Sequence, residues 1–260
     1  MQLGMLTDPR RDPLDEIRFA ADHDFDYVDL ALAAPATALE TTDWKMLGQA
    51  IADAGLQVTG HAGSDFVINN PSPAIRQAAL NELRRCVDAA QIIGASLLTT
   101  RFLGWPAHFD EATGYEFYRQ LYEILIGHGQ TRGVEIALET SANNAHQLKW
   151  FREIFHRLPG LKLLYNIGNG NVETQQSMTR AYMFALADRL VQIHASDNDG
   201  TRVDRLPLGA PANGGIDWRR ELQTLRSFNY DGPITVDVRG DRQWLRGSVV
   251  VLRELWPQVE

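Results

Sequence analysis

Polar side chains of the kinds that bind cations or move protons stand at the ends of short apolar runs along the whole chain. Seven such residues end or nearly end a run, and one more acid follows the first run: Asp29, His61, Arg101, Glu139, Asn166, His194 and Asp237, with Asp8. A charge at the end of an apolar run costs several kcal/mol unless it is paired or bound to an ion. Each residue alone is equally consistent with a paired structural charge, but the set of seven favours a shared site.

Four of these residues have the ligand types of a divalent metal ion. Glu139, Asn166, His194 and Asp237 offer two carboxylates, one amide oxygen and one imidazole, and they come from four successive runs. Oxygen and imidazole ligands with open coordination positions suit Mn²⁺, Mg²⁺, Co²⁺ or Zn²⁺. We therefore predict one divalent ion at this site, with a weak or vacant site as the alternative.

The elements that must position these residues follow from the hydropathy pattern. Eight apolar runs predict strands at 2–6, 26–32, 56–61, 96–102, 134–139, 161–167, 190–195 and 233–238. Helical spacing of apolar residues between and after them predicts helices at 13–23, 43–54, 73–93, 115–129, 144–158, 178–187, 217–228 and 244–256. The strand runs are near-continuously apolar, which is typical of a parallel sheet that is covered on both faces.

Eight βα units of about 32 residues each, with no linker between them, predict a single-domain (β/α)₈ TIM barrel over residues 1–260. A doubly wound sheet is disfavoured because the segment TDPRRDP, which follows the first strand, contains no glycine. In a barrel the carboxyl ends of all strands meet at one mouth. The polar residues at the strand ends are therefore expected to converge there.

Composition limits the classes of function and partner. The chain has 25 Lys plus Arg against 33 Asp plus Glu, a net charge of −8 that disfavours nucleic-acid binding. It contains one cysteine, which fits a reducing compartment, and it shows neither a signal peptide nor an apolar stretch of about 18 residues. We expect a cytoplasmic protein with a small-molecule substrate and no membrane partner.

Two covalent mechanisms are disfavoured by the positions of their nucleophiles. Lys45 and Lys149 lie in predicted helices, and Lys162 opens a strand at the opposite end of the barrel from the site. A Schiff-base aldolase is therefore not expected. Cys86 lies among apolar residues in the middle of a predicted helix, where a packing role is expected and a nucleophilic one is not.

The carboxyl half carries motifs that identify a family. The stretch HASDNDGTRVDRLPLGAPANGGIDW at 194–218 combines a histidine-led acidic run, a P-L-G segment, a Gly-rich turn and I-D-W. Together with ALE at 137–139, LLYNIGN at 163–169 and ITVDV at 234–238, it resembles the xylose isomerase-like TIM barrels. That superfamily contains sugar isomerases and epimerases as well as apurinic endonucleases. The resemblance extends over all strands, but its sharp motifs lie after residue 135.

The resemblance implies that the family's four metal ligands fall on Glu139, Asn166, His194 and Asp237. Two of them depart from the family pattern, which has Asp in place of Asn166 and Glu in place of Asp237. Replacing a ligand carboxylate by an amide removes a full negative charge beside the ion. We therefore expect weaker metal binding than in a site with three carboxylates.

The resemblance also implies a mechanism. In the relatives, the carboxylates of the fifth and eighth strands face opposite sides of an α-hydroxycarbonyl substrate. One carboxylate removes the proton from the carbon next to the carbonyl while the ion polarises the carbonyl oxygen. Glu139 and Asp237 would be this catalytic pair, in the isomerisation or epimerisation of a ketose or sugar derivative through an enediolate.

Further residues near the strand ends are expected to contact the substrate: His61, Arg101, Trp105, Asn169, Asp197 and Arg239. Relatives often place a histidine at the positions of His61 and Asn169, and we expect His61 at the rim, in contact with the substrate and not with the ion. Trp105 would form an apolar wall. Arg101 or Arg239 would bind an anionic or hydroxyl group.

Other functions remain open on the same framework. Enolate formation next to a carbonyl also begins elimination, so a lyase or dehydratase is one alternative, and the unusual Asn166 and Asp237 favour an altered barrel that serves as a binding or accessory subunit. An apurinic endonuclease is disfavoured because at most His61, His194 and His108 can reach the site. A homo-oligomer is a further expectation, since Tyr115, Phe117, Tyr118 and Tyr122 would suit a partner surface as well as a core.

Overall fold

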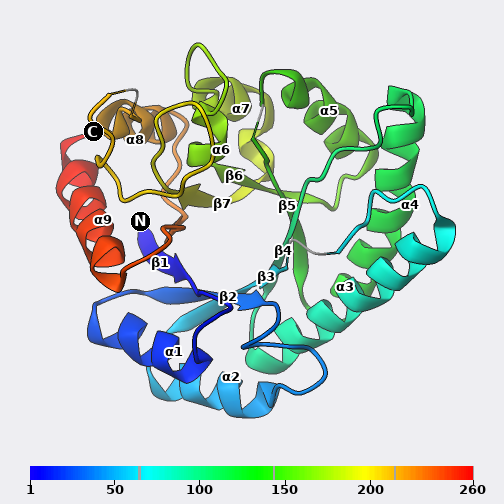
Figure 1. Ribbon diagram of the computed structural model, residues 1–260, viewed down its shortest axis with the longest axis horizontal. Helices are drawn as coiled ribbons and strands as arrows, with labels where there is room; N and C mark the ends of the chain where they lie inside the picture. The colour runs from blue at the N-terminus through cyan, green and yellow to red at the C-terminus, as the bar shows by residue number, and fades with distance from the viewer. Residues whose placement is uncertain (64–65, 143, 214, 260) are drawn as a thin grey trace.

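Eight parallel strands close into a barrel in chain order, and a ring of helices surrounds it (Figure 1). The computed structural model describes residues 1–63, 66–142, 144–213 and 215–259. The strands are β1 (Gln2–Leu6), β2 (Tyr27–Leu32), β3 (Gln57–Ala62), β4 (Leu97–Arg101), β5 (Glu135–Glu139), β6 (Lys162–Asn166), β7 (Leu190–Ala195) and β8 (Pro233–Val236). The predicted (β/α)₈ fold is confirmed.

The helices follow the strands as expected, with one addition. They are α1 (Pro13–Asp22), α2 (Trp44–Asp53), α3 (Pro73–Ile93), α4 (Glu111–Gln130), α5 (Asn144–Arg157), α6 (Ile167–Asn171), α7 (Thr179–Leu186), α8 (Trp218–Ser227) and α9 (Arg242–Leu255), with 3₁₀ turns η1 (Ala187–Arg189) and η2 (Trp256–Gln258). The short helix α6 was not predicted, because it begins directly where β6 ends. Asp43 and Asp217 accept hydrogen bonds from the first turns of α2 and α8, as helix caps do.

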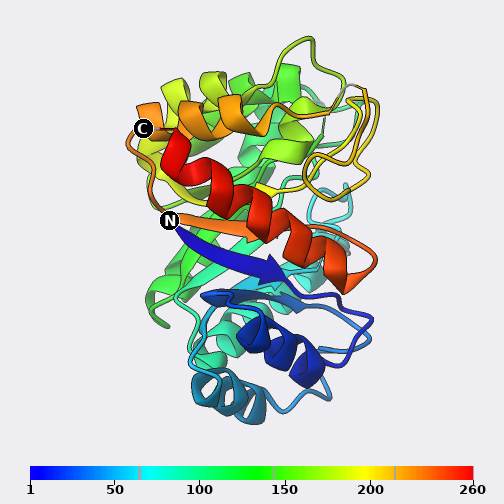
Figure 2. The same ribbon diagram turned by 90° about the vertical axis from the view of Figure 1, so that its left-hand side faces the viewer.

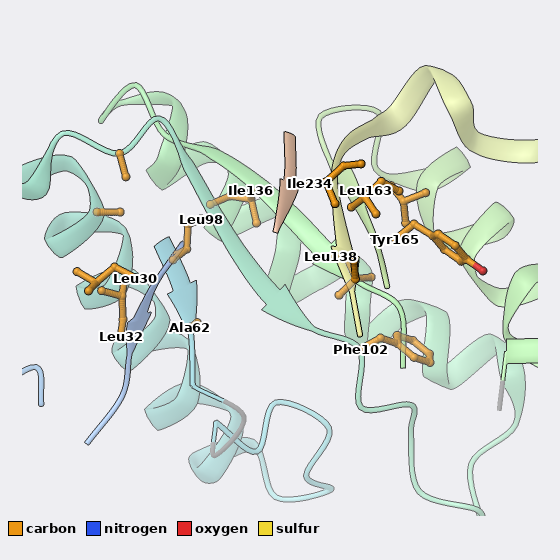
Figure 3. Close-up of a cluster of buried hydrophobic side chains, with 14 of the residues drawn as sticks. Leu30, Leu32, Ala62, Leu98, Phe102, Ile136, Leu138, Leu163, Tyr165 and Ile234 are labelled. Atoms are coloured by element: carbon orange, nitrogen blue, oxygen red, sulfur yellow. The ribbon is translucent and has the colours of Figure 1, made fainter. Parts of the chain in front are cut away.

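The strands bury one face against the helices and the other inside the barrel. The outward-facing side chains join a single large apolar core, part of which is drawn in Figure 3: Leu30, Leu32, Ala62, Leu98, Phe102, Ile136, Leu138, Leu163, Tyr165 and Ile234. Inside the barrel a small apolar group consists of Leu97, Ala137 and Leu164. Two residues further along their strands stand Thr99, Glu139 and Asn166, so the interior becomes polar toward the carboxyl ends.

An irregularity in β7 decides which way the end of that strand faces. One extra residue, Val191, lies between the register pairs Leu163–Leu190 and Leu164–Gln192. Beyond it, Asn166 of β6 is in register with His194 of β7. A one-residue shift moves every later side chain of a strand to the other face. Without it Ile193 would pair with Asn166, and His194 would face the helices.

The ring closes where α9 lies beside α1 and β1 (Figures 1 and 2). Arg242, at the start of α9, donates through Nε to the Oε1 atom of Glu16 in α1 over 3.0 Å. The other oxygen of Glu16 accepts from the backbone N–H of Asp8, in the loop after β1. This buried carboxylate therefore fixes the first loop at the barrel mouth. Among the described residues no helix is both long and apolar enough to cross a membrane.

Candidate metal and substrate site

Three buried side chains from β3, β5 and β7 form a compact group of metal-ligand types. One ligand atom each from His61, Glu139 and His194 lies within 4.8 Å of the other two. The Nε2 atom of His61 is 3.2 Å from Oε2 of Glu139, and its ring stacks on that of His194 with centroids 5.5 Å apart. His61 therefore lies inside the group and not at the rim, where it was expected.

Asp29 of β2 fixes the ring of His194 by a hydrogen bond to Nε2. The Nε2–H group of His194 donates to Oδ2 of Asp29 over 2.9 Å, and both side chains are fully buried. Thr59 donates to the second oxygen of Asp29 over 2.8 Å. Although burial opposes ionisation, the hydrogen bond from His194 lowers the pKa of Asp29. Because Nε2 donates to Asp29, Nδ1 is the ring nitrogen of His194 that faces Glu139 and Asp237.

Within the described part of the chain, three buried atoms at this point have no hydrogen-bond partner. They are Nδ1 of His194 and both carboxylate oxygens of Asp237. Nδ1 lies 3.6 Å from Oε1 of Glu139 and 3.9 Å from Oδ2 of Asp237. Burial opposes a charge on His194, but the hydrogen bond to Asp29 and the nearby carboxylate of Glu139 outweigh it and raise the pKa of His194 to about 9. Converging lone pairs of this kind need a proton or a cation between them, and this donor set fits a divalent metal ion.

Glu139 is held as a carboxylate by its neighbours. Burial would raise its pKa, but the charge of Arg101 and the neighbouring imidazoles of His194 and His61 hold the pKa of Glu139 well below its ordinary value. Arg101 donates through Nε to Oε2 over 3.0 Å. Glu139 is therefore ionised at neutral pH, as a base or an anionic metal ligand must be.

Asn166 binds Glu139 through its nitrogen. Its Nδ2 donates to Oε1 of Glu139 over 2.8 Å, while its Oδ1 accepts from the backbone N–H of Asn169 over 3.0 Å. The amide oxygen is used to cap α6, so in this arrangement it is turned away from the ligand group, contrary to the predicted ligand role. Asn169 is also buried and donates to the carbonyl of Thr140. Both residues fix the end of β6.

Asp197 organises the loop that follows β7. Its Oδ1 accepts from the backbone N–H groups of Asn198 and Ile216, and its Oδ2 accepts from the N–H of Gly209 and from the indole of Trp218. The carboxylate is fully buried and its four lone pairs are occupied. The expectation that Asp197 contacts the substrate is therefore corrected to a structural role.

Trp105 belongs to an aromatic group between α4 and α5. Its ring lies 4.6 Å from Trp150 and 5.4 Å from Tyr115. Gly114 lets it approach, since a Cβ atom there would lie 2.2 Å from the indole. Trp105 is half-buried in this group, so the structure shows its packing and leaves the wall of a substrate pocket as a prediction. Three of the four aromatic residues proposed for a partner surface are buried instead in the core: Tyr115, Tyr118 and Tyr122.

Two arginines approach Asp237 from the rim. Nε of Arg205 lies 3.4 Å from Oδ2 of Asp237, and Nε of Arg239 lies 4.0 Å from Oδ1. Burial, and then the charge of Arg205, lower the pKa of Arg239 against the opposing effect of Asp237. Arg239 was expected here from the sequence, whereas Arg205 was not. Arg205 has a left-handed backbone conformation (φ 52°), and nothing in the sequence around it predicts this conformation.

Comparison with known proteins points to one family. A family model described as "Xylose isomerase-like TIM barrel" matches residues 17–255. Among solved structures, the chain is similar to a D-tagatose 3-epimerase-like protein, with a TM-score of 0.83, 18% identity, and coverage of 100% of this chain and 98% of that one. It is similar also to the 3-keto-D-glucoside 4-epimerase YcjR of E. coli (TM-score 0.80, 19% identity, coverage 98% and 99%). A third similar structure is an L-ribulose 3-epimerase (TM-score 0.82, 14% identity, coverage 100% and 96%).

One curated relative matches at the level of sequence. It is the uncharacterized protein y4fM of Sinorhizobium fredii, 26% identical over 182 residues, which cover 66% of this chain. The match spans 57% of that protein's length. The solved structures are less than 20% identical to this chain, so they show a shared fold alone. The chemistry of this chain has to be inferred from its own site.

Proposed function

The chain belongs to the xylose isomerase-like TIM barrel family, and from this we propose that it is a sugar isomerase or epimerase. Sugar epimerases are among the solved structures that it resembles. The observation that carries the proposal is the arrangement of Glu139 and Asp237, whose oxygens lie 3.6 Å and 3.9 Å from the same ring nitrogen, Nδ1 of His194. Two carboxylates that share one imidazole suit proton transfer beside a carbonyl group.

The residues that would hold a divalent ion are His194 through Nδ1, Glu139 and Asp237, with His61 beside Glu139. The buried atoms of His194 and Asp237 that make no hydrogen bond within the described residues support this assignment. Such an ion supplies Lewis-acid polarisation of a carbonyl oxygen. Asn166 holds Glu139 in place through its amide nitrogen.

Glu139 is the proposed base. As an ionised carboxylate it accepts the proton from the carbon next to the substrate carbonyl, and Arg101 and Asn166 fix the orientation of its two oxygens. Asp237 is the proposed partner that delivers a proton to the opposite face. Delivery of a proton to the opposite face of the same carbon gives an epimer. Delivery to the former carbonyl carbon, with transfer of the hydroxyl proton between the two oxygens, gives the aldose–ketose isomer.

The test is to incubate Mn²⁺-loaded protein in deuterated water with ketoses and with their phosphate and acid derivatives. NMR of the sugars then measures how much deuterium each has taken up. We expect wild type to exchange the proton next to the carbonyl and Glu139→Gln to lose this activity by about 10²–10⁴-fold. Glu135→Gln is the matched control, because Glu135 lies on the same strand, exposed and paired with Lys162. Absence of exchange across the panel, or equal exchange by Glu139→Gln, contradicts the proposed function.

A further inference from the structure

An ion-pair network extends from the candidate site to the rim near β8 and β1. Its links join side-chain nitrogens and oxygens no more than 4.0 Å apart, and they pass through His194, while His61 branches from Glu139. Within the described part of the chain it contains six arginines and five carboxylates: Arg10, Arg11, Arg101, Arg205, Arg239 and Arg242, with Asp8, Glu16, Asp29, Glu139 and Asp237. In a chain with net charge −8, the arginines of this network thus outnumber its carboxylates by one.

Arg205 and Arg239 are the arginines of this network that are least tightly held. Both lie against Asp237, at 3.4 Å and 4.0 Å, and Arg239 lies 3.8 Å from Asp8. Asp8 is bound more closely by Arg10, over 2.6 Å and 2.9 Å. Charge-assisted hydrogen bonds are typically about 2.7–2.9 Å long. Among the residues that the structure describes, the guanidinium N–H groups of Arg205 and Arg239 are thus left to bind a further acceptor.

The backbone holds this pair together. The N–H of Arg239 donates to the carbonyl of Arg205 over 3.0 Å, which ties the loop after β8 to the loop after β7. Next to Arg205, Leu206 forms an antiparallel bridge with Asp197. Arg205 itself keeps a left-handed backbone at φ 52°, which costs free energy for a residue with a Cβ atom. The side chains are 15% and 29% exposed, so both are largely withdrawn from water yet reachable from the mouth.

We propose that the substrate carries a negatively charged group, a phosphate or a carboxylate, and that Arg205 and Arg239 bind it. This inference rests on the proposed function and narrows its substrate class to anionic sugar derivatives. A divalent ion at Asp237 would add two positive charges beside the two arginines. An anionic group on the substrate would compensate this positive charge. The planar forks of two guanidinium groups match the oxygens of either anion.

Calorimetric titration of Mn²⁺-loaded protein tests the inference with four probes: D-fructose, D-fructose 1-phosphate, D-fructose 6-phosphate and 2-keto-D-gluconate. At least one anionic probe should bind tenfold or more tightly than D-fructose, and which one binds distinguishes a phosphate from a carboxylate. Arg205→Met and Arg239→Met should each remove most of this preference, whereas Arg205→Lys should retain part of it. Arg202→Met is the control, because Arg202 lies on the same loop with its side chain 79% exposed and paired with Asp204.

Metal titration separates loss of anion binding from damage to the site. Removing a positive charge beside Asp237 leaves Mn²⁺ binding unchanged or makes it tighter, while anion binding weakens in the same variant. Equal or absent binding of all four probes, or an equal loss in Arg202→Met, overturns the inference. Deuterium exchange into D-fructose as fast as into the anionic probes also overturns it but leaves the proposed function intact. Arginine-dependent anion binding without any exchange supports the inference and contradicts the proposed function.

Discussion

Asp29 and His194 are joined by one buried hydrogen bond, Nε2–H to Oδ2 over 2.9 Å, although 165 positions separate them in the chain. This bond fixes which nitrogen of the histidine carries a proton. It therefore fixes which nitrogen faces Glu139 and Asp237 at the mouth. A carboxylate behind a ligand histidine orients the ring and strengthens its basicity.

Asp29→Asn should weaken divalent-metal binding by about 10–100-fold, because an amide neither fixes the ring of His194 nor supports its basicity as a carboxylate does. Titration calorimetry with Mn²⁺ gives the affinity, and circular dichroism checks that the barrel is intact. Asp53→Asn, an exposed change on α2, is the control. Wild-type affinity in Asp29→Asn would show that this carboxylate does not support a metal ligand.

Metal binding should strengthen as the pH rises from 6.5 to 9. The pKa of His194 is raised from 6.5 to about 9 in the metal-free protein, mainly by its pairing with Asp29 and Glu139 against the effect of burial. An ion at Nδ1 must displace this proton, so Kd should fall about tenfold per pH unit in this range. Calorimetry in buffers of different ionisation enthalpy should detect about one proton released per ion. A Kd that does not change with pH would exclude Nδ1 as a ligand.

The raised pKa of His194 also makes the metal-free protein less stable at high pH. Protonated His194 stabilises the folded state fully below pH 6.5, and this contribution is lost as the pH rises through about 9. Its size is up to about 3 kcal/mol in the free energy of unfolding. Urea titrations at pH 6.5 and pH 9 measure the loss, and His194→Gln should reduce it. If wild type and His194→Gln lose equal stability, another group is responsible.

Asn166→Asp should lower the thermal stability of the metal-free protein but increase the stabilisation that a bound metal ion gives. It replaces the N–H donor 2.8 Å from Glu139 by a second carboxylate, so repulsion should lower the Tm of the metal-free protein by several degrees. Added Mn²⁺ should raise the Tm more than in wild type, with a Kd about tenfold lower, because a carboxylate attracts the ion more strongly than an amide. Asn81→Asp, on the exposed face of α3, is the control. A variant that responds to Mn²⁺ as wild type does would place the ion away from Asn166.

Asp197→Asn should destabilise the loop from 197 to 218 by about 3 kcal/mol. The amide replaces an acceptor of four hydrogen bonds by a group whose nitrogen faces two N–H donors. Limited proteolysis within this loop and urea unfolding measure the change. Asp199→Asn is the control, since among the described residues the side chain of Asp199 accepts hydrogen bonds only from Thr201. Unchanged cleavage and unchanged stability would rule out this structural role.

The barrel was predictable from sequence because each strand and each helix is marked by the pattern of apolar residues within its own segment. Strands that are covered on both faces are near-continuously apolar, helices repeat their apolar residues at helical spacing, and these patterns alternate eight times. Glu139, His194 and Asp237 were identifiable for a related reason, since each interrupts or ends such a run. Where a strand ends, the chain passes from the core to the mouth, and polar side chains there are visible in the pattern.

Orientation at the mouth was decided only by the tertiary structure. The extra residue Val191 turns His194 into the barrel, and nothing in the apolar run 190–195 marks it, because both faces of that strand are buried. The cap that α6 requires turns the oxygen of Asn166 away from Glu139. Arg205 reaches Asp237 through a left-handed backbone held by a contact between two loops. Residue types therefore determined which groups gather at the mouth, whereas long-range pairing determined which atoms of those groups meet.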